Sequence, residues 1–151
     1  MLNVTIHTDG SCSGNPGVGG YGAFLVCNGN ERKVCGYSVK TTTNNKMELT
    51  AVIEAVKWLN RVQKAPCQIE VHTDSKYIVD CISHNSKKWF IGRPNEDLWV
   101  ELITVVAKGK HKITFEKVKG HSGDKYNELA DKLAKEQCTI AKHQLLKLKG
   151  V

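Results

Sequence analysis

The sequence predicts an α/β protein in which a mixed β-sheet is flanked by helices. Three observations support this fold class. The first forty residues alternate apolar and polar side chains in three strand-like segments, the apolar period becomes helical near residue 45, and short strands then alternate with helices. Three consecutive strands followed by an α–β–α–β–α order favour one sheet covered by helices. A chain of 151 residues fits one domain with a proper core.

The first three segments indicate an antiparallel meander. The first strand is expected to end at Asp9-Gly10, because six glycines crowd between Gly10 and Gly22 and predict a turn-rich connection. The pair Asn28-Gly29 is a hairpin signal between the second and third strands. These strands are expected at residues 2–9, 21–27 and 33–40.

The rest of the chain is expected to alternate between helix and strand. An apolar stripe that includes Leu49, Val52 and Val56 predicts a helix from residue 45 that stops before Pro66. The later elements are expected as a strand at 68–73, a helix capped at Asp74-Ser75 and running to 82, a helix at 98–107, a strand at 113–118 and a helix at 126–137.

Composition restricts the class of protein. Lys and Arg outnumber Asp and Glu by 22 to 15, so the net charge of +7 favours a polyanionic partner. Many basic proteins bind no nucleic acid, however, and the charge alone does not identify the partner. The six cysteines lack CxxC spacing, and the chain shows neither a signal peptide nor a membrane-length apolar run. A reduced, cytoplasmic, monomeric protein without a membrane partner is therefore expected.

Four acidic residues lie far apart, each inside a short motif. They are Asp9 in TDGSCSGNPG, Glu48 in TTNNKMEL, Asp74 in HTDSKY and Asp131 in GHSGDKYNELADKLA. Two stand at the ends of predicted strands, one is in the first turn of a helix, and one is near the inward side of the last helix. Four gathered carboxylates would repel one another without a cation, and oxygen ligands favour Mg²⁺ or Mn²⁺. The pattern predicts a metal site if the four converge.

Each acid also has a structural explanation when it is taken alone. Asp9 suits a turn before Gly10, Asp74 an N-cap, Glu48 a helix N-terminus, and Asp131 an i,i+4 ion pair with Lys135. These alternatives stay open at the level of the residues themselves.

Taken together, four ordered segments resemble the type 1 ribonuclease H family. The matching segments are residues 9–22, 42–49, 73–79 and 118–131. The resemblance implies a five-stranded mixed sheet in the order 3-2-1-4-5. It also implies an endonuclease that hydrolyses the RNA strand of an RNA–DNA hybrid and leaves 5′-phosphate and 3′-hydroxyl ends. We expect residues 1–138 to form this catalytic domain and residues 139–151 to form a C-terminal tail, packed or frayed at its end.

The resemblance assigns catalytic roles residue by residue. The family's acidic metal ligands match Asp9, Glu48, Asp74 and Asp131, which implies two Mg²⁺ ions with substrate, replaceable by Mn²⁺. His121 matches a loop histidine that moves protons during hydrolysis, and a purely structural histidine is the alternative.

Hybrid-binding residues are also implied. They are Cys12, Ser13, Gly14 and Asn15 against the RNA backbone, Thr43 at a DNA phosphate, Asn44, Asn45 and Gln68 in the minor groove, and Lys87, Lys88 and Trp89 in a basic loop. Helix capping is the alternative for the two asparagines. Residues 83–97 are too few for the helical basic protrusion of many bacterial members, so the alternative there is a solvated loop with Trp89 packed on the core.

Other functions remain open on the sequence. An excised reverse-transcriptase domain would carry the same four acids. A non-catalytic hybrid-binding module would be expected to lack an acid or His121, and none is missing here. A basic scaffold protein would leave the ordered motifs without an explanation.

Overall fold

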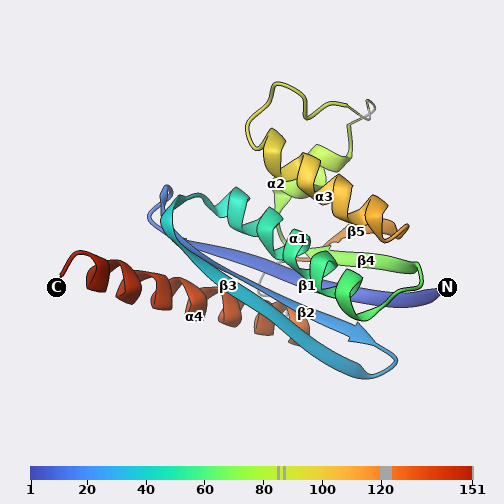
Figure 1. Ribbon diagram of the computed structural model, residues 1–151, viewed down its shortest axis with the longest axis horizontal. Helices are drawn as coiled ribbons and strands as arrows, with labels where there is room; N and C mark the ends of the chain where they lie inside the picture. Colours follow the sequence, from blue (N-terminus) through green and yellow to red (C-terminus); the bar gives the residue numbers. More distant parts are fainter. Residues whose placement is uncertain (85, 87, 120–123, 151) are drawn as a thin grey trace.

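A computed structural model describes residues 1–84, 86, 88–119 and 124–150. Its centre is a five-stranded sheet in the order β3-β2-β1-β4-β5, with helices packed on both faces (Figure 1). The strands are β1 (Leu2–Ser13), β2 (Gly17–Cys27), β3 (Asn30–Thr42), β4 (Cys67–Thr73) and β5 (Lys112–Lys117). The helices of the described part are α1 (Asn44–Val62), α2 (Lys76–Ile82), α3 (Glu96–Lys108) and α4 (Lys125–Leu148). The predicted fold class and strand order are confirmed.

Four of the five strands run in the same direction, and β2 runs opposite to them. β1, β2 and β3 are antiparallel neighbours, whereas β4 is parallel to both β1 and β5. The meander predicted for the first forty residues is therefore present. The parallel strands require crossover connections, which α1 and the segment containing α2 and α3 supply.

The helices form two layers on opposite faces of the sheet. A Cβ on Gly19 would meet Met47 of α1, and a Cβ on the next residue, Gly20, would meet Ala134 and Cys138 of α4. Because successive strand residues point to opposite faces, α1 and α4 lie on opposite sides. Figure 1 shows the long α4 alone along one face, with α2 and α3 beside α1 on the other.

The main core lies between the sheet and α1. Most of its fully buried side chains come from β1, β4, α1 and α2, and Trp99 and Leu102 of α3 close it at one side. The largest of these fully buried side chains are Ile6, Leu49, Ile53, Ile69 and Ile78. Burial of this apolar surface fixes α1 against the strands that carry the predicted acids.

The glycine-rich segment differs from its prediction. Residues 10–13 continue β1, and residues 17–22 already belong to β2, so the long turn predicted there is wrong. Gly20 and Gly22 lie under α4. A Cβ on Gly20 would come within 2.3 Å of Cys138 N, and a Cβ on Gly22 would come within 2.9 Å of the Leu133 side chain. The missing side chains let the helix approach the strand closely, and that is why glycine occurs in this strand.

The last helix is longer than predicted. α4 continues to Leu148, so its expected end at residue 137 is wrong and the boundary drawn at residue 138 falls inside the helix. Cys138 and Ala141 are buried on its sheet-facing side, and this packing stabilises the extra turns. None of the helices in the described residues combines the length and hydrophobicity of a membrane span. The six cysteines, all within the described part, are free thiols.

Candidate active site

Three of the four predicted acids converge. One carboxylate oxygen from each of Asp9, Glu48 and Asp74 lies within 4.8 Å of the other two. The parallel register explains how Asp9 and Asp74 meet, because Thr8 pairs with Thr73 at the last position of the β1–β4 ladder. Each aspartate is the next residue along its chain. The predicted carboxylate cluster therefore forms where β1 and β4 separate.

The sequence predicted that Asp9 stands at the end of its strand, and this prediction is wrong. β1 continues past this position because Asp9 still pairs with Gly22 of β2. Only the partnership with β4 stops there. The turn-forming alternative for Asp9 is therefore wrong, and its side chain projects from extended backbone at the edge of the β1–β4 pair.

Glu48 reaches the cluster because Gly10 has no side chain. A Cβ on Gly10 would lie 2.6 Å from Glu48 N and 2.8 Å from the Met47 Cβ, so α1 rests directly on the β1 backbone. Gly10 thus shapes the site, although the sequence reasoning assigned it no role beyond a turn. Its signal was its place directly after Asp9. Glu48 itself lies just beyond the first turn of α1 and is buried, so a solvent-facing helix-terminus role is excluded.

The cluster is electrostatically strained without a cation. Burial raises the pKa of Asp9 to about 7, and the charge of Asp74 adds to this while the Gly10 amide, which donates to Asp9 Oδ1 at 2.9 Å, opposes it. Burial, followed by the charge of Asp9, raises the pKa of Glu48 well above its ordinary value. Glu48 Oε2 is buried without a hydrogen-bond partner among the described residues. Such groups fit a site built for a cation.

Asp131 lies at the edge of this cluster. Its side chain is 30% exposed, and its Oδ2 is 3.1 Å from Lys135 Nζ, so the i,i+4 ion pair considered from the sequence is present. Asp131 also interacts with Asp9 through a side-chain hydrogen bond that raises the pKa of Asp9. The two roles are compatible, because one carboxylate can face both a lysine and the cluster.

Asp74 is not a helix cap. Ser75 caps α2, and its Oγ accepts a hydrogen bond of 3.2 Å from the Ile78 amide. The Asp74 carboxylate is therefore not used as the cap of the following helix.

Sequence comparison identifies the family. The family model described as RNase H matches residues 2–139, which is most of the chain. The chain belongs to the ribonuclease H family. Membership identifies it as a nuclease.

The sequence of this ribonuclease H family member aligns with curated relatives along nearly their whole length. It is 45% identical over 146 residues to the ribonuclease H of Ehrlichia canis, covering 91% of this chain and 95% of the relative. It is 41% identical over 143 residues to the ribonuclease H of Chlorobium phaeobacteroides, covering 88% and 93%.

Solved structures share the fold. LC11-RNase H1 in complex with an RNA/DNA hybrid superposes with a TM-score of 0.76 at 25% identity, covering 91% of this chain and 98% of that one. The N-terminal RNase H domain of a Mycobacterium tuberculosis protein, solved as a fusion with maltose-binding protein, gives 0.76 at 24% identity, covering 95% and 99%.

Two of the predicted substrate-binding segments of this ribonuclease H family chain contact each other. Asn15 Oδ1 accepts a 3.2 Å hydrogen bond from the Asn44 amide, and Cys12 Sγ lies 3.4 Å from the Thr42 carbonyl oxygen. The turn after β1, with Ser13 and the positive-φ Gly14, therefore lies against the start of α1.

The N-cap of α1 is not one of the two asparagines, so the capping alternative is wrong for them. Thr43 caps α1 by accepting from the Lys46 amide at 3.2 Å, so Asn44 is not the cap. Asn44 and Asn45 are exposed in the first turn. Their side chains are accessible to a ligand that approaches this edge of the protein.

Gln68 lies apart from the other predicted contacts. It is the second residue of β4, next to Asn3 of β1, whereas Asp74 follows the last residue of the same strand. The structure therefore does not bring Gln68 to the carboxylate cluster.

The basic loop is partly described. Lys88 is exposed, and Trp89 packs on the core with its ring centroid 5.0 Å from that of Trp99. The packed position considered for Trp89 is thus present. His121 and Lys87 lie outside the described residues, so their predicted roles stay predictions.

Proposed function

We propose that this chain is an endoribonuclease that hydrolyses the RNA strand of RNA–DNA hybrids by two-metal-ion catalysis. The observation that carries the proposal is the buried meeting of Asp9, Glu48 and Asp74, with Asp131 at its edge, in a ribonuclease H family chain. The similar LC11-RNase H1 was solved with an RNA/DNA hybrid, which supports the same substrate here.

The carboxylate cluster fits divalent cations. Its donors are oxygens, the pKa values of Asp9 and Glu48 are raised by burial and mutual charge, and Glu48 Oε2 has no partner within the described part. Asp9, Glu48, Asp74 and Asp131 would hold two Mg²⁺ ions, or Mn²⁺ in their place. When bound, the ions supply positive charge that activates a water molecule and stabilises the departing oxygen.

The proposed reaction is hydrolysis at phosphorus. The water oxygen forms a bond to the scissile phosphorus, the bond to the 3′ oxygen breaks, and that oxygen leaves as a hydroxyl. The products carry 5′-phosphate and 3′-hydroxyl ends. His121 is proposed to move the proton between water and leaving group. No nucleophilic side chain is required.

Hybrid binding is proposed along the edge that joins the β1–β2 turn to α1. Cys12, Ser13, Gly14 and Asn15 approach the RNA backbone there, Thr43 holds a DNA phosphate, and Asn44 and Asn45 contact both strands in the minor groove. Lys87, Lys88 and Trp89 would contact the DNA backbone from the basic loop. We further propose that the enzyme acts as a monomer in the cytoplasm.

A cleavage assay tests the activity. Labelled RNA–DNA hybrid, RNA duplex and single strands are incubated with Mg²⁺ or EDTA, and end analysis of the products follows. We expect cleavage of the hybrid alone, and only with the metal. Asp9→Asn and Asp74→Asn should abolish cleavage while hybrid binding persists. Asp80 is an exposed acid paired with Lys76, so the control variant Asp80→Asn should cleave the hybrid normally. A tenth of wild-type activity in both site variants would refute the assignment.

A further inference from the structure

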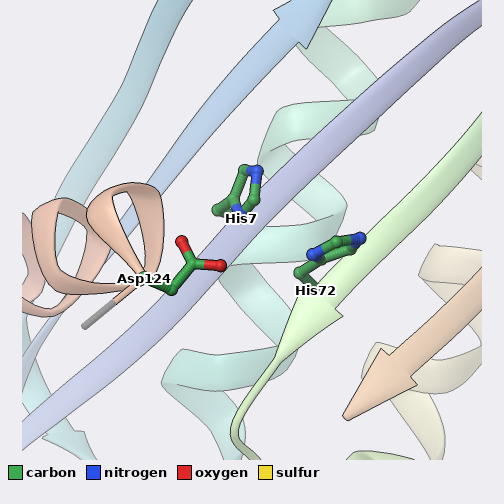
Figure 2. Close-up of side chains that lie close together, drawn as sticks. All are labelled: His7, His72 and Asp124. Carbon is green, nitrogen blue, oxygen red and sulfur yellow. The ribbon is translucent and has the colours of Figure 1, made fainter. Parts of the chain in front are cut away.

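A second group of metal-ligating side chains lies beside the carboxylate cluster. His7 of β1, His72 of β4 and Asp124 at the start of α4 each offer one ligand atom, and these three atoms lie within 4.8 Å of one another. Figure 2 shows the three side chains turned toward a common point from three different elements. His7 is only 6% exposed, whereas His72 and Asp124 are partly exposed, so the group reaches from the interior toward the surface.

The hydrogen bonding of His72 leaves one ring nitrogen available. His72 Nε2 lies 2.6 Å from Glu70 Oε1. An ionised carboxylate can only accept, so the proton is on Nε2 and the lone pair is on Nδ1. A carboxylate that orients a histidine in this way is the usual second layer of a metal site. His72 is thus held in the tautomer that a metal ligand needs.

The free nitrogens are buried. Both His72 Nδ1 and His7 Nδ1 are inaccessible and have no hydrogen-bond partner among the described residues. Unpaired buried polar atoms are rare and call for a specific explanation. Packing explains part of the arrangement, since His7 stacks on Tyr126 at 4.9 Å and meets His72 edge-on at 4.8 Å. Ring packing does not explain why two buried nitrogens are left without a partner beside a carboxylate.

Asp124 is fixed in place by its role as a helix cap. Its Oδ1 accepts hydrogen bonds of 3.0 Å from the amides of Tyr126 and Asn127. The carboxylate is therefore oriented by the start of α4. Burial lowers the pKa of His7 to about 4, and the nearby charge of Asp124 opposes this shift only in part. A ligand that is already oriented loses little conformational freedom when it binds an ion.

We propose that His7, His72 and Asp124 form a second metal site that takes a divalent transition-metal ion, with Zn²⁺ as the representative. Two imidazoles and one carboxylate suit zinc and its neighbours, whereas Mg²⁺ prefers the all-oxygen cluster. Ligand atoms of a tetrahedral zinc site are about 3.4 Å apart at bond lengths of about 2.1 Å. The ion would therefore draw ligand atoms that lie up to 4.8 Å apart together by up to about 1.4 Å, with water as the fourth ligand.

The position of this site gives it a structural role. An ion there would join β1, β4 and the first residue before α4, and α4 is the helix that carries Asp131. It would act as a clamp that holds α4 against the two strands bearing Asp9 and Asp74. The proposal does not depend on the nuclease activity, because its test measures metal binding.

Zinc titration of this chain tests the site. Chelator-treated protein is titrated with Zn²⁺ by calorimetry in excess Mg²⁺, which occupies the oxygen cluster. X-ray absorption at the zinc edge then reports the ligands. We expect one Zn²⁺ per chain, two imidazole ligands in the absorption spectrum, and a rise in the melting temperature on binding.

Two variants and one control decide the ligands. Asp124→Asn keeps a good helix cap but removes the anionic ligand, and His72→Asn removes a nitrogen ligand. Each should weaken zinc binding at least tenfold and abolish the thermal shift, while apo melting curves show that both variants fold. His143→Asn, an exposed histidine on α4, should bind as wild type does. All-oxygen coordination, or unchanged affinity in the two variants, would overturn the proposal.

Discussion

Asp9 and Glu48 bring their carboxyl groups together in the protein interior, where they are 5% and 7% exposed. The two residues come from β1 and α1, and Gly10 permits the contact by removing a side chain between them. Their closeness raises the pKa of Glu48, and burial raises that of both groups. The pair therefore stores unfavourable free energy that a bound cation would relieve.

Metal removal should make stability fall as the pH rises. The pKa of Asp9 is about 7 in the folded protein against 3.8 as its ordinary value, so its protonated form is favoured by folding. This contribution is complete below pH 3.8 and is lost as the pH rises toward and through about 7. Urea unfolding in EDTA across this range measures it. Mg²⁺ should restore stability at the high end.

Asp9→Asn isolates the Asp9 contribution. In EDTA above pH 7 this variant should be more stable than wild type by on the order of 2 kcal/mol, because a buried charge is gone. The difference should shrink toward pH 4, and Mg²⁺ should stabilise wild type more than the variant. Equal pH profiles for the two proteins in EDTA would contradict the strained pair.

Gly10→Ala should damage the active site and the fold together. The new Cβ would lie 2.6 Å from Glu48 N, so α1 must move away from β1. We expect a loss of about 3 kcal/mol, at the upper end of overpacking costs, and a weaker Mg²⁺ affinity. Gly29→Ala is the control, because its Cβ meets no atom within 4 Å and only its φ of +79° is strained. It should cost about 1 kcal/mol and leave metal binding intact.

His111 should make the protein less stable in acid. Its Nδ1 accepts a 3.0 Å hydrogen bond from the Cys67 amide, and its Nε2 lies 2.6 Å from Asn60 Oδ1. Burial lowers its pKa below the ordinary 6.5, so folding favours the neutral ring. The stability it contributes is present above pH 6.5 and is lost as the pH falls through the folded-state pKa.

Substitution of His111 measures this effect. His111→Gln should cost about 2 kcal/mol at pH 8, because the Cys67 amide loses its acceptor. The cost should diminish as the pH falls, since protonation removes the same acceptor from wild type. Chemical unfolding at several pH values gives the comparison, with His143→Gln as the exposed control. A cost that is constant with pH would refute the role assigned to the neutral ring.

Substitution of Trp89 should affect stability, whereas substitution of its basic neighbours should affect substrate binding. Trp89 is half-buried against Trp99, so Trp89→Ala should lower the free energy of unfolding by about 2 kcal/mol. Lys88 and Arg93 are exposed, so their joint replacement by Ala should leave stability unchanged. It should weaken hybrid binding about three- to tenfold and reduce the salt dependence of the binding constant. Unchanged binding would exclude this loop from the interface.

Local pattern predicted the elements because side-chain periodicity reflects which face of a strand or helix is buried. The apolar stripe of Leu49, Val52 and Val56 indicated α1, and all three side chains are buried. Local pattern gave a wrong prediction for the glycines of β2, because glycine is compatible both with a turn and with a strand that lies under a helix. Only the approach of Cys138 and Leu133 to Gly20 and Gly22 distinguishes the two.

The sequence by itself determined the element order, the acids and, through their flanking motifs, the family. Tertiary structure alone decided which acids meet and how closely. Asp9, Glu48 and Asp74 are joined by strand register and by the helix resting on Gly10, and Asp131 remains at the edge beside Lys135. The pairing of His7 with His72 had the same origin, since both are neighbours in the parallel ladder. Such contacts depend on register and packing between distant segments, which no local periodicity encodes.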